Sequence, residues 1–193
     1  MTTARDNPFR AARLDALEFR FSDSLADSSW DELLARLETL KFRAAIIGKH
    51  GRGKTTLLDQ IAPHLKKRGW KIHRLQLNTS RRDFSRAQWR SFSSLGAHDF
   101  LLLDGAEQLS TLRWKFLCWK TRQAGGLLIT THRPGRLPTL MECQTSPGLL
   151  LDLARVLAPQ CALDETSARV LFVRHGGNIR DALRELYDLE ILK

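Results

Sequence analysis

Gly48-Lys49-His50-Gly51-Arg52-Gly53-Lys54-Thr55 matches the pattern GxxxxGK[ST]. A short apolar run, Ala44 to Ile47, precedes it and is typical of a buried parallel strand, and residues 55 to 67 follow with a helical pattern. Glycines let such a loop wrap around a phosphate with its N–H groups pointing inward, and the start of a helix adds a positive dipole. The sequence therefore predicts a phosphate-binding loop between a strand and a helix.

Two side chains of this loop have expected roles toward a nucleotide. The Lys54 ammonium is expected to bridge the β- and γ-phosphates, and the Thr55 hydroxyl is expected to hold Mg²⁺. The residues expected to contact the nucleotide are Gly48, Lys49, His50, Gly51, Arg52, Gly53, Lys54, Thr55 and Thr56.

A second apolar run, residues 100 to 103, ends in a carboxylate at Asp104. It begins about 45 residues after Lys54, where the third strand of such a fold belongs. Asp104 is expected to bind the Mg²⁺ shell through water, and Glu107 is expected to orient and activate the water that attacks the γ-phosphate. By itself, an apolar run followed by Asp also fits a helix N-cap after a core strand.

A fourth strand is expected to end at Thr130-Thr131-His132. Ligands of parallel sheets bind at the carboxyl ends of the strands, so Thr131 or His132 is expected near the γ-phosphate or the attacking water. A polar loop start before Pro134 explains the same residues without a role in catalysis.

These motifs resemble those of P-loop NTPases with a catalytic glutamate, and more narrowly those of AAA+ ATPases. The resemblance covers about residues 40 to 190. It implies ATP and Mg²⁺ as cofactors, a polar sensor at Thr131, and a helical lid whose third helix begins with Arg180 after Gly176-Gly177. Arg180 is then a second sensor of the γ-phosphate, or else a surface residue of a helix N-terminus. No arginine finger is assigned among Arg113, Arg122, Arg133 and Arg136.

Alternating strand and helix patterns predict an α/β fold: a parallel-sheet P-loop NTPase three-layer sandwich with a small C-terminal helical lid. We expect an N-terminal segment (1–42), a P-loop core (43–146) and the lid (147–193). Strands are expected at 17–21, 44–47, 70–77, 100–103, 127–130 and 140–143, and helices at about 29–40, 55–67, 81–91, 110–122, 148–157, 165–173 and 179–189.

The net charge of +10 is concentrated in two stretches. Residues 64–90 hold nine Lys or Arg against one Asp, and residues 113–136 hold six with no acid. Trp89, Trp114 and Trp119 lie among them. Such patches attract polyanions, so nucleic acid is an expected partner, although solvated helix faces with buried tryptophans explain the pattern equally well.

No run approaches the roughly 20 apolar residues of a membrane-spanning helix, and the first residues lack a signal-peptide pattern, so we expect a cytoplasmic protein that does not bind membranes. The three cysteines, Cys118, Cys143 and Cys161, lack metal-ligand spacing and are expected to be reduced thiols.

Three functions fit these features. The first is an ATPase that acts on a macromolecular partner, such as DNA or a protein, and the basic stretches favour it. The second is a P-loop small-molecule kinase, and the third is a nucleotide-gated binding switch with little turnover. Since no NKxD-like element for reading guanine is present, ATP is favoured over GTP. The sequence leaves the oligomeric state open.

Overall fold

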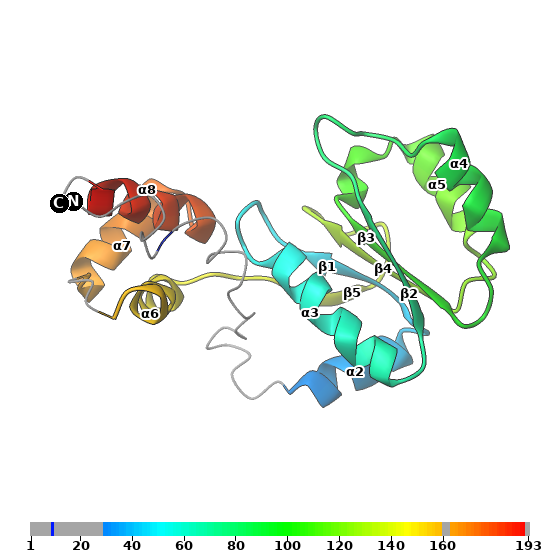
Figure 1. Ribbon diagram of the computed structural model, residues 1–193, viewed down its shortest axis with the longest axis horizontal. Helices are drawn as coiled ribbons and strands as arrows, with labels where there is room; N and C mark the ends of the chain where they lie inside the picture. Colours follow the sequence, from blue (N-terminus) through cyan, green and yellow to red (C-terminus); the bar gives the residue numbers. More distant parts are fainter. Residues whose placement is uncertain (1–8, 10–28, 160–162, 192–193) are drawn as a thin grey trace. The chain divides into compact units, whose positions relative to one another are not determined.

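The computed structural model describes Phe9, residues 29–159 and residues 163–191, and its centre is a five-stranded sheet (Figure 1). All four strand pairings are parallel. The strands are β1 (Arg43–Ile47), β2 (Lys71–Gln76), β3 (Asp99–Asp104), β4 (Gly126–Thr131) and β5 (Thr139–Glu142). The helices are α2 (Trp30–Thr39), α3 (Lys54–Lys67), α4 (Arg86–Ser91), α5 (Thr111–Lys120), α6 (Pro147–Leu157), α7 (Glu165–Arg174) and α8 (Ile179–Ile191), with short 3-10 turns η2 (Phe92–Ser94) and η3 (Ala106–Gln108).

The strand order is β2-β3-β4-β1-β5, so β4 lies between β1 and β3. Leu103 of β3 pairs with Ile129 of β4, and Ile47 of β1 pairs with Thr131 of β4. Because all strands run in the same direction, the ends of β1, β3 and β4 meet at one edge of the sheet. We call it the carboxyl edge.

Helices cover both faces of the sheet, with α2 and α3 on one side and α4 and α5 on the other (Figure 1). Alternate residues of each strand point to opposite faces. The odd-numbered core residues Leu101, Leu103, Leu127 and Ile129 join one buried cluster with Trp89, Trp114 and Leu117 from α4 and α5. This three-layer α/β arrangement confirms the predicted fold class.

The last three described helices form a separate core. Phe9 is buried there among apolar residues of α6, α7 and α8, including Leu150, Leu171 and Leu183. By its contacts the chain divides into two compact units, which we call the sheet unit (Asp27–Gly48 and Leu57–Glu142) and the loop–lid unit (Lys49–Thr56 and Cys143–Lys193, with Phe9).

Most predicted elements are present, but α4 is shorter than the helix expected at 81–91. Asn78 forms an isolated antiparallel bridge with Arg81, and the Asn78 side chain accepts hydrogen bonds from the N–H groups of Ser80 and Arg81. The helix starts only after Ser85, which forms a capping box with Gln88. Local side-chain bonds therefore hold residues 78–81 in a turn. The strand expected at 17–21 lies outside the described residues.

Candidate nucleotide-binding site

The glycine loop leaves β1 at Gly48, whose N–H donates to the Thr131 carbonyl of β4 over 3.2 Å. Gly51 and Gly53 have φ of 69° and 78°, a left-handed conformation that residues with a Cβ rarely adopt. At Gly51 a Cβ would also lie only 1.6 Å from the side-chain oxygen of Asn178. The backbone conformation therefore favours glycine at position 51, and a larger residue would displace the Asn178 side chain.

Lys54 is the first residue of α3, and its side chain is buried. Its Nζ donates to the Lys49 carbonyl over 2.8 Å, so the ammonium is held inside the loop by a backbone oxygen. Thr55 lies on the exposed side of the helix start, and Lys49 and His50 are exposed as well. The loop thus presents an ammonium, a hydroxyl and a helix N-terminus within a few residues.

Residues before and within the lid contact this loop inside the loop–lid unit. A Cβ at Gly177 would lie 3.5 Å from the Arg52 guanidinium and 3.5 Å from the Thr145 hydroxyl, and that hydroxyl donates to the Gly177 carbonyl. The Arg52 Nε is buried without a partner among the described residues. The turn before α8 is therefore packed directly on the glycine loop.

Arg180 is the second residue of α8 and is exposed. Its neighbour Asn178 begins the helix, since its side chain accepts a hydrogen bond from the Asp181 N–H over 3.3 Å and donates to the Asp181 carboxylate. The residue of this turn that touches the glycine loop is thus Asn178, which the sequence analysis did not single out.

Asp104 ends β3 and is buried. One carboxylate oxygen accepts a 2.5 Å hydrogen bond from the Thr130 hydroxyl of β4, and that hydroxyl accepts from the Gly105 N–H over 2.8 Å. Gly105 has φ of 78°, and a Cβ there would lie 2.2 Å from the Leu77 carbonyl oxygen at the end of β2. The carboxylate is therefore positioned by a neighbouring strand and by a turn that needs glycine.

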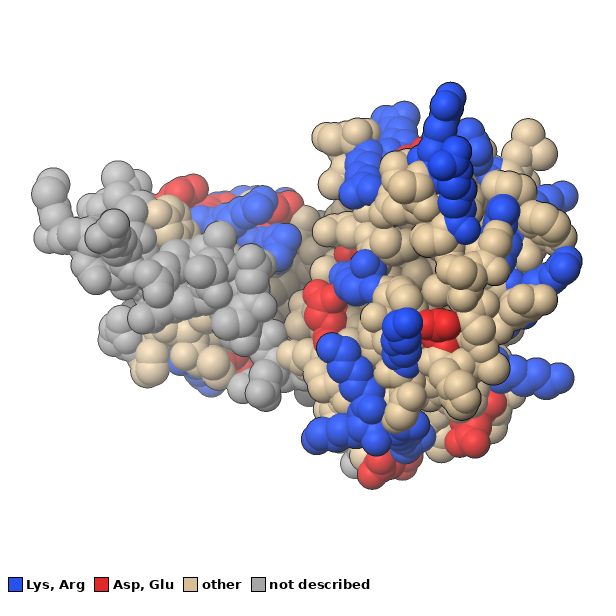
Figure 2. Space-filling model, turned by 45° about the vertical axis from the view of Figure 1, so that its right-hand side comes forward, with Lys and Arg blue, Asp and Glu red and all other residues tan. Residues whose placement is uncertain are grey.

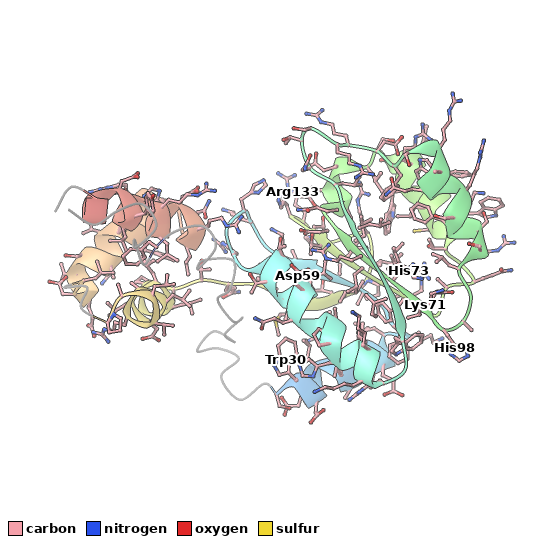
Figure 3. All side chains as sticks on the ribbon, in the orientation of Figure 1. Trp30, Asp59, Lys71, His73, His98 and Arg133 are labelled. Atoms are coloured by element: carbon pink, nitrogen blue, oxygen red, sulfur yellow. The ribbon has the colours of Figure 1, made fainter. Side chains whose placement is uncertain are left out.

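Arg74 of β2 links the same carboxylate to α3. Its Nε donates to Asp59 over 2.7 Å, and its Nη2 lies 3.6 Å from the second Asp104 oxygen. Figure 3 labels Asp59 on α3, the helix that begins with Lys54. This arginine places a positive charge beside Asp104. Its position there follows only from the register in which β2 pairs with β3.

Glu107 lies on η3, three residues after Asp104. One of its carboxylate oxygens lies 3.2 Å from His132 Nε2, and the other is buried without a hydrogen-bond partner among the described residues. A buried unpaired carboxylate oxygen is costly unless a ligand or water donates to it. Glu107 and His132 thus form a polar pair at the carboxyl edge.

Arg136 adds a positive charge near this pair. Burial lowers the pKa of the Arg136 guanidinium, and the Glu107 carboxylate opposes that effect. The guanidinium stacks over Trp114 at 5.1 Å and donates to the Leu109 carbonyl over 2.5 Å. Glu107 therefore has a histidine and an arginine as its electrostatic neighbours.

Thr131 and Thr130 point to opposite faces of β4. The Thr131 hydroxyl donates to the Arg133 carbonyl over 3.2 Å, whereas Thr130 contacts Asp104. Strand alternation identifies Thr130 as the threonine that faces Asp104 once β4 is known to pair with β3. The sequence alone does not show that these two strands are neighbours.

The tryptophans Trp89, Trp114 and Trp119 of the two basic stretches differ in their exposure to solvent. Trp89 and Trp114 are 9% exposed and belong to the core, whereas Trp119 is 54% exposed. On the face shown in Figure 2, basic side chains are spread over the sheet unit and acidic ones are fewer. Among these three tryptophans, Trp119 is therefore the one whose side chain is largely exposed to solvent.

The donors at the two parts of the candidate site suit Mg²⁺ and phosphate. The Thr55 hydroxyl and the Asp104 carboxylate are hard oxygen donors, which Mg²⁺ prefers, and the glycine loop offers backbone N–H groups and the Lys54 ammonium to anions. The residues present fit Mg²⁺ with a nucleoside triphosphate.

The sheet order and the glycine loop after β1 belong to a P-loop fold like that of AAA+ ATPases. Solved structures of RuvB from Thermotoga maritima share it. One RuvB variant is 21% identical over 91% of this chain and 63% of that chain, with a TM-score of 0.59. The RuvB Holliday junction branch migration motor is 18% identical over 92% of this chain and 63% of that chain, with a TM-score of 0.57.

This chain thus spans less than two thirds of the RuvB chains, and at these identities the likeness concerns the fold. No family model matches the sequence, and a search of curated proteins found no match. Among the described helices, none has both the length and the apolar character needed to span a membrane.

Proposed function

We propose that this protein binds ATP with Mg²⁺ and hydrolyses it, and that turnover changes its conformation on a macromolecular partner. The observation that carries the proposal is the sheet order, which brings the end of loop-bearing β1 to the same edge as Asp104 and Glu107, with β4 between them. Phosphoryl transfer needs a phosphate loop and carboxylates together, because positioning and electrostatics supply most of the catalysis.

In this proposal, each residue of the candidate site has a role that follows from its chemistry. The loop N–H groups and Lys54 would bind the phosphates, the Thr55 hydroxyl would hold Mg²⁺, and Asp104 would bind the Mg²⁺ shell through water. Bound Mg²⁺ supplies positive charge that offsets the charge of the phosphates. Thr130 keeps the Asp104 carboxylate oriented, and Arg74 moderates its charge.

Glu107 orients the attacking water in this proposal. Its unpaired buried oxygen is suited to accept a proton from that water, while His132 holds the other oxygen. Thr131, His132 and Arg180 remain proposed sensors of the γ-phosphate.

Steady-state ATP hydrolysis by the wild-type protein and by Glu107→Gln tests the mechanism. The amide keeps the shape but cannot accept a proton, so turnover is expected to fall by about 10²- to 10⁴-fold while ATP affinity stays nearly unchanged. Glu142→Gln, on the exposed end of β5, is the matched control. Equal turnover in wild type and Glu107→Gln would remove Glu107 from the mechanism.

DNA is the proposed partner. The name of one RuvB structure describes a motor at DNA junctions, and residues 64–90 here carry nine basic residues against one acid. Arg81, Arg82 and Arg86 are exposed, so their replacement by Gln is expected to weaken binding and to lower the slope of log K against log salt by about 0.9 per lost contact. Arg155→Gln and Arg169→Gln on the lid are controls, and affinity independent of salt would exclude this model.

A nucleotide-gated switch is the second proposed function, and the contact of Asn178 with Gly51 favours it. A ligand that orders the loop would act directly on the turn that begins α8, so binding alone could shift the lid equilibrium. Tight ATP binding with negligible hydrolysis, both with and without DNA, would favour the switch over the ATPase.

A further inference from the structure

The outer face of α5 carries a stripe of exposed apolar side chains. Leu112 is 80% exposed, Phe116 39% and Trp119 54%. Spacings of four and three residues place them on one face of the helix. Single exposed apolar residues are ordinary, but a contiguous row of three marks an interaction surface.

This stripe is preorganised by aromatic packing. The Phe116 and Trp119 rings stack with centroids 5.7 Å apart and planes at 20°, and Phe116 also packs on Trp89 at 5.1 Å. Because Trp89 belongs to the core, the stripe is anchored and loses little conformational entropy when a partner binds.

Basic groups lie at the Trp119 end of the stripe. Lys120 lies 5.5 Å from the Trp119 ring centroid and Arg122 lies 5.4 Å from it. Arg113 lies over Trp89 but is already paired with Asp83 over 3.1 Å. Neither α4 nor α5 contains an acidic residue. We call Leu112, Phe116, Trp119, Lys120 and Arg122 the α5 patch. It is apolar along the helix and positive at its Trp119 end.

The contacts of Trp119 decide which class of partner fits. A nucleic-acid base needs a free ring face for stacking, yet Phe116 stacks on Trp119 and two cations lie over it. Leu112, the most exposed member, offers a base no ring and no hydrogen bond. An acidic amphipathic helix complements both parts, with apolar side chains on the stripe and carboxylates at the cations.

We propose that the α5 patch binds an acidic amphipathic helix of a partner protein. This surface is separate from the nucleotide site and goes beyond the proposed ATPase function. The partner's leucines cover Leu112 and the edges of the two rings, and its Asp or Glu side chains pair with Lys120 and Arg122.

A fluorescein-labelled synthetic helix of about 18 residues, or five turns, tests the proposal when its Leu residues follow the i, i+4, i+7 pattern and Glu fills the other positions. Fluorescence anisotropy with the full-length protein is expected to show saturable binding. Leu112→Ser and Trp119→Ser are each expected to raise Kd by about tenfold, because each removes a buried apolar contact. Val170→Ser is the matched control, since Val170 of α7 is also about half exposed.

Each result supports or overturns the proposal. Binding that is weakened about tenfold in each of the two α5 variants, unchanged in Val170→Ser and absent for the same peptide with Lys in place of Glu supports it. No binding of the acidic helix by the folded wild-type protein overturns it. If Trp119→Ser instead weakens binding of a single-stranded oligonucleotide, or dissociates a dimer in sedimentation, the patch serves nucleic acid or a second copy. Either result overturns the proposal.

Discussion

The glycine loop and the carboxylate centre around Asp104 are held in place in different ways. The loop is organised by residues adjacent in sequence: Lys54 donates to the Lys49 carbonyl, and Gly51 and Gly53 adopt left-handed conformations. The carboxylate of Asp104 is organised by side chains of two other strands, Arg74 and Thr130. A local motif can therefore be recognised from sequence, whereas a centre assembled from several strands needs the sheet order.

Lys54→Ala should produce the largest effect on nucleotide binding, because it removes the charged group of the locally organised loop. A hydrogen bond to a charged group contributes about 1.5–3 kcal/mol, so Kd for ATP is expected to rise on the order of a hundredfold. Calorimetric titration with ATP and Mg²⁺ measures it. Lys49→Ala, at an exposed position of the same loop, should change Kd little, and similar losses in both variants would contradict a special role for Lys54.

Gly105→Ala tests the turn after Asp104. A Cβ there would lie 2.2 Å from a backbone oxygen and would require an unfavourable φ, so the free energy of unfolding is expected to fall by about 3 kcal/mol. Urea denaturation of wild type and variant measures this difference. Gly69→Ala is the matched control, because Gly69 has φ of 88° and no neighbour within 4 Å of the added Cβ. If both variants lose the same free energy of unfolding, the loss in Gly105→Ala comes from the backbone conformation and not from the contact with Leu77.

Thr130→Val tests the support that β4 gives to Asp104. Valine keeps the shape but leaves the Asp104 oxygen and the Gly105 N–H without this hydrogen bond, and we expect a loss of about 2 kcal/mol in the free energy of unfolding. The apparent affinity for Mg²⁺ in ATP binding should fall as well. Thr131→Val, at the next position, should leave Mg²⁺ affinity nearly unchanged. A greater loss of Mg²⁺ affinity in Thr131→Val than in Thr130→Val would show that Thr131, and not Thr130, supports the metal site.

Asp99→Asn should have the smallest effect, at the opposite edge of the sheet. The Gly96 N–H and His73 lower the pKa of Asp99 below its ordinary value of 3.8, with a smaller contribution from Lys71 (Figure 3 labels His73 and Lys71). Its stabilising contribution is thus present above pH 3.8 and is lost as the pH falls through the folded-state pKa.

Thermal denaturation at several pH values checks this prediction. The variant should melt at a lower temperature than the wild type near neutral pH, and the two melting temperatures should converge below pH 3.8. A constant difference across this range would show that Asp99 acts through packing or neutral hydrogen bonds. Asp31→Asn, on a largely exposed residue, is the control.

Much of the fold was predictable because its signals are local. Apolar runs before Gly48 and Asp104 predicted β1 and β3, and the helix expected at about 29–40 is α2, which the structure begins with a capping box of Ser29 and Glu32. The predicted start of α4 at residue 81 was wrong, because the side chain of Asn78 holds a turn that competes with the helix. The roles of Lys54, Asp104, Glu107, Thr131 and Arg180 stay predictions.

By itself, the sequence determined the alternation of strands and helices, the glycine loop and the positive charge of two stretches, since each depends on neighbours along the chain. Only the tertiary structure decided that Thr130 contacts Asp104, that Arg74 lies beside it, and that Trp119 is exposed while Trp89 and Trp114 are buried. The physical reason is that strand order and helix packing depend on burial between distant segments, and one position along a strand changes the face to which a side chain points.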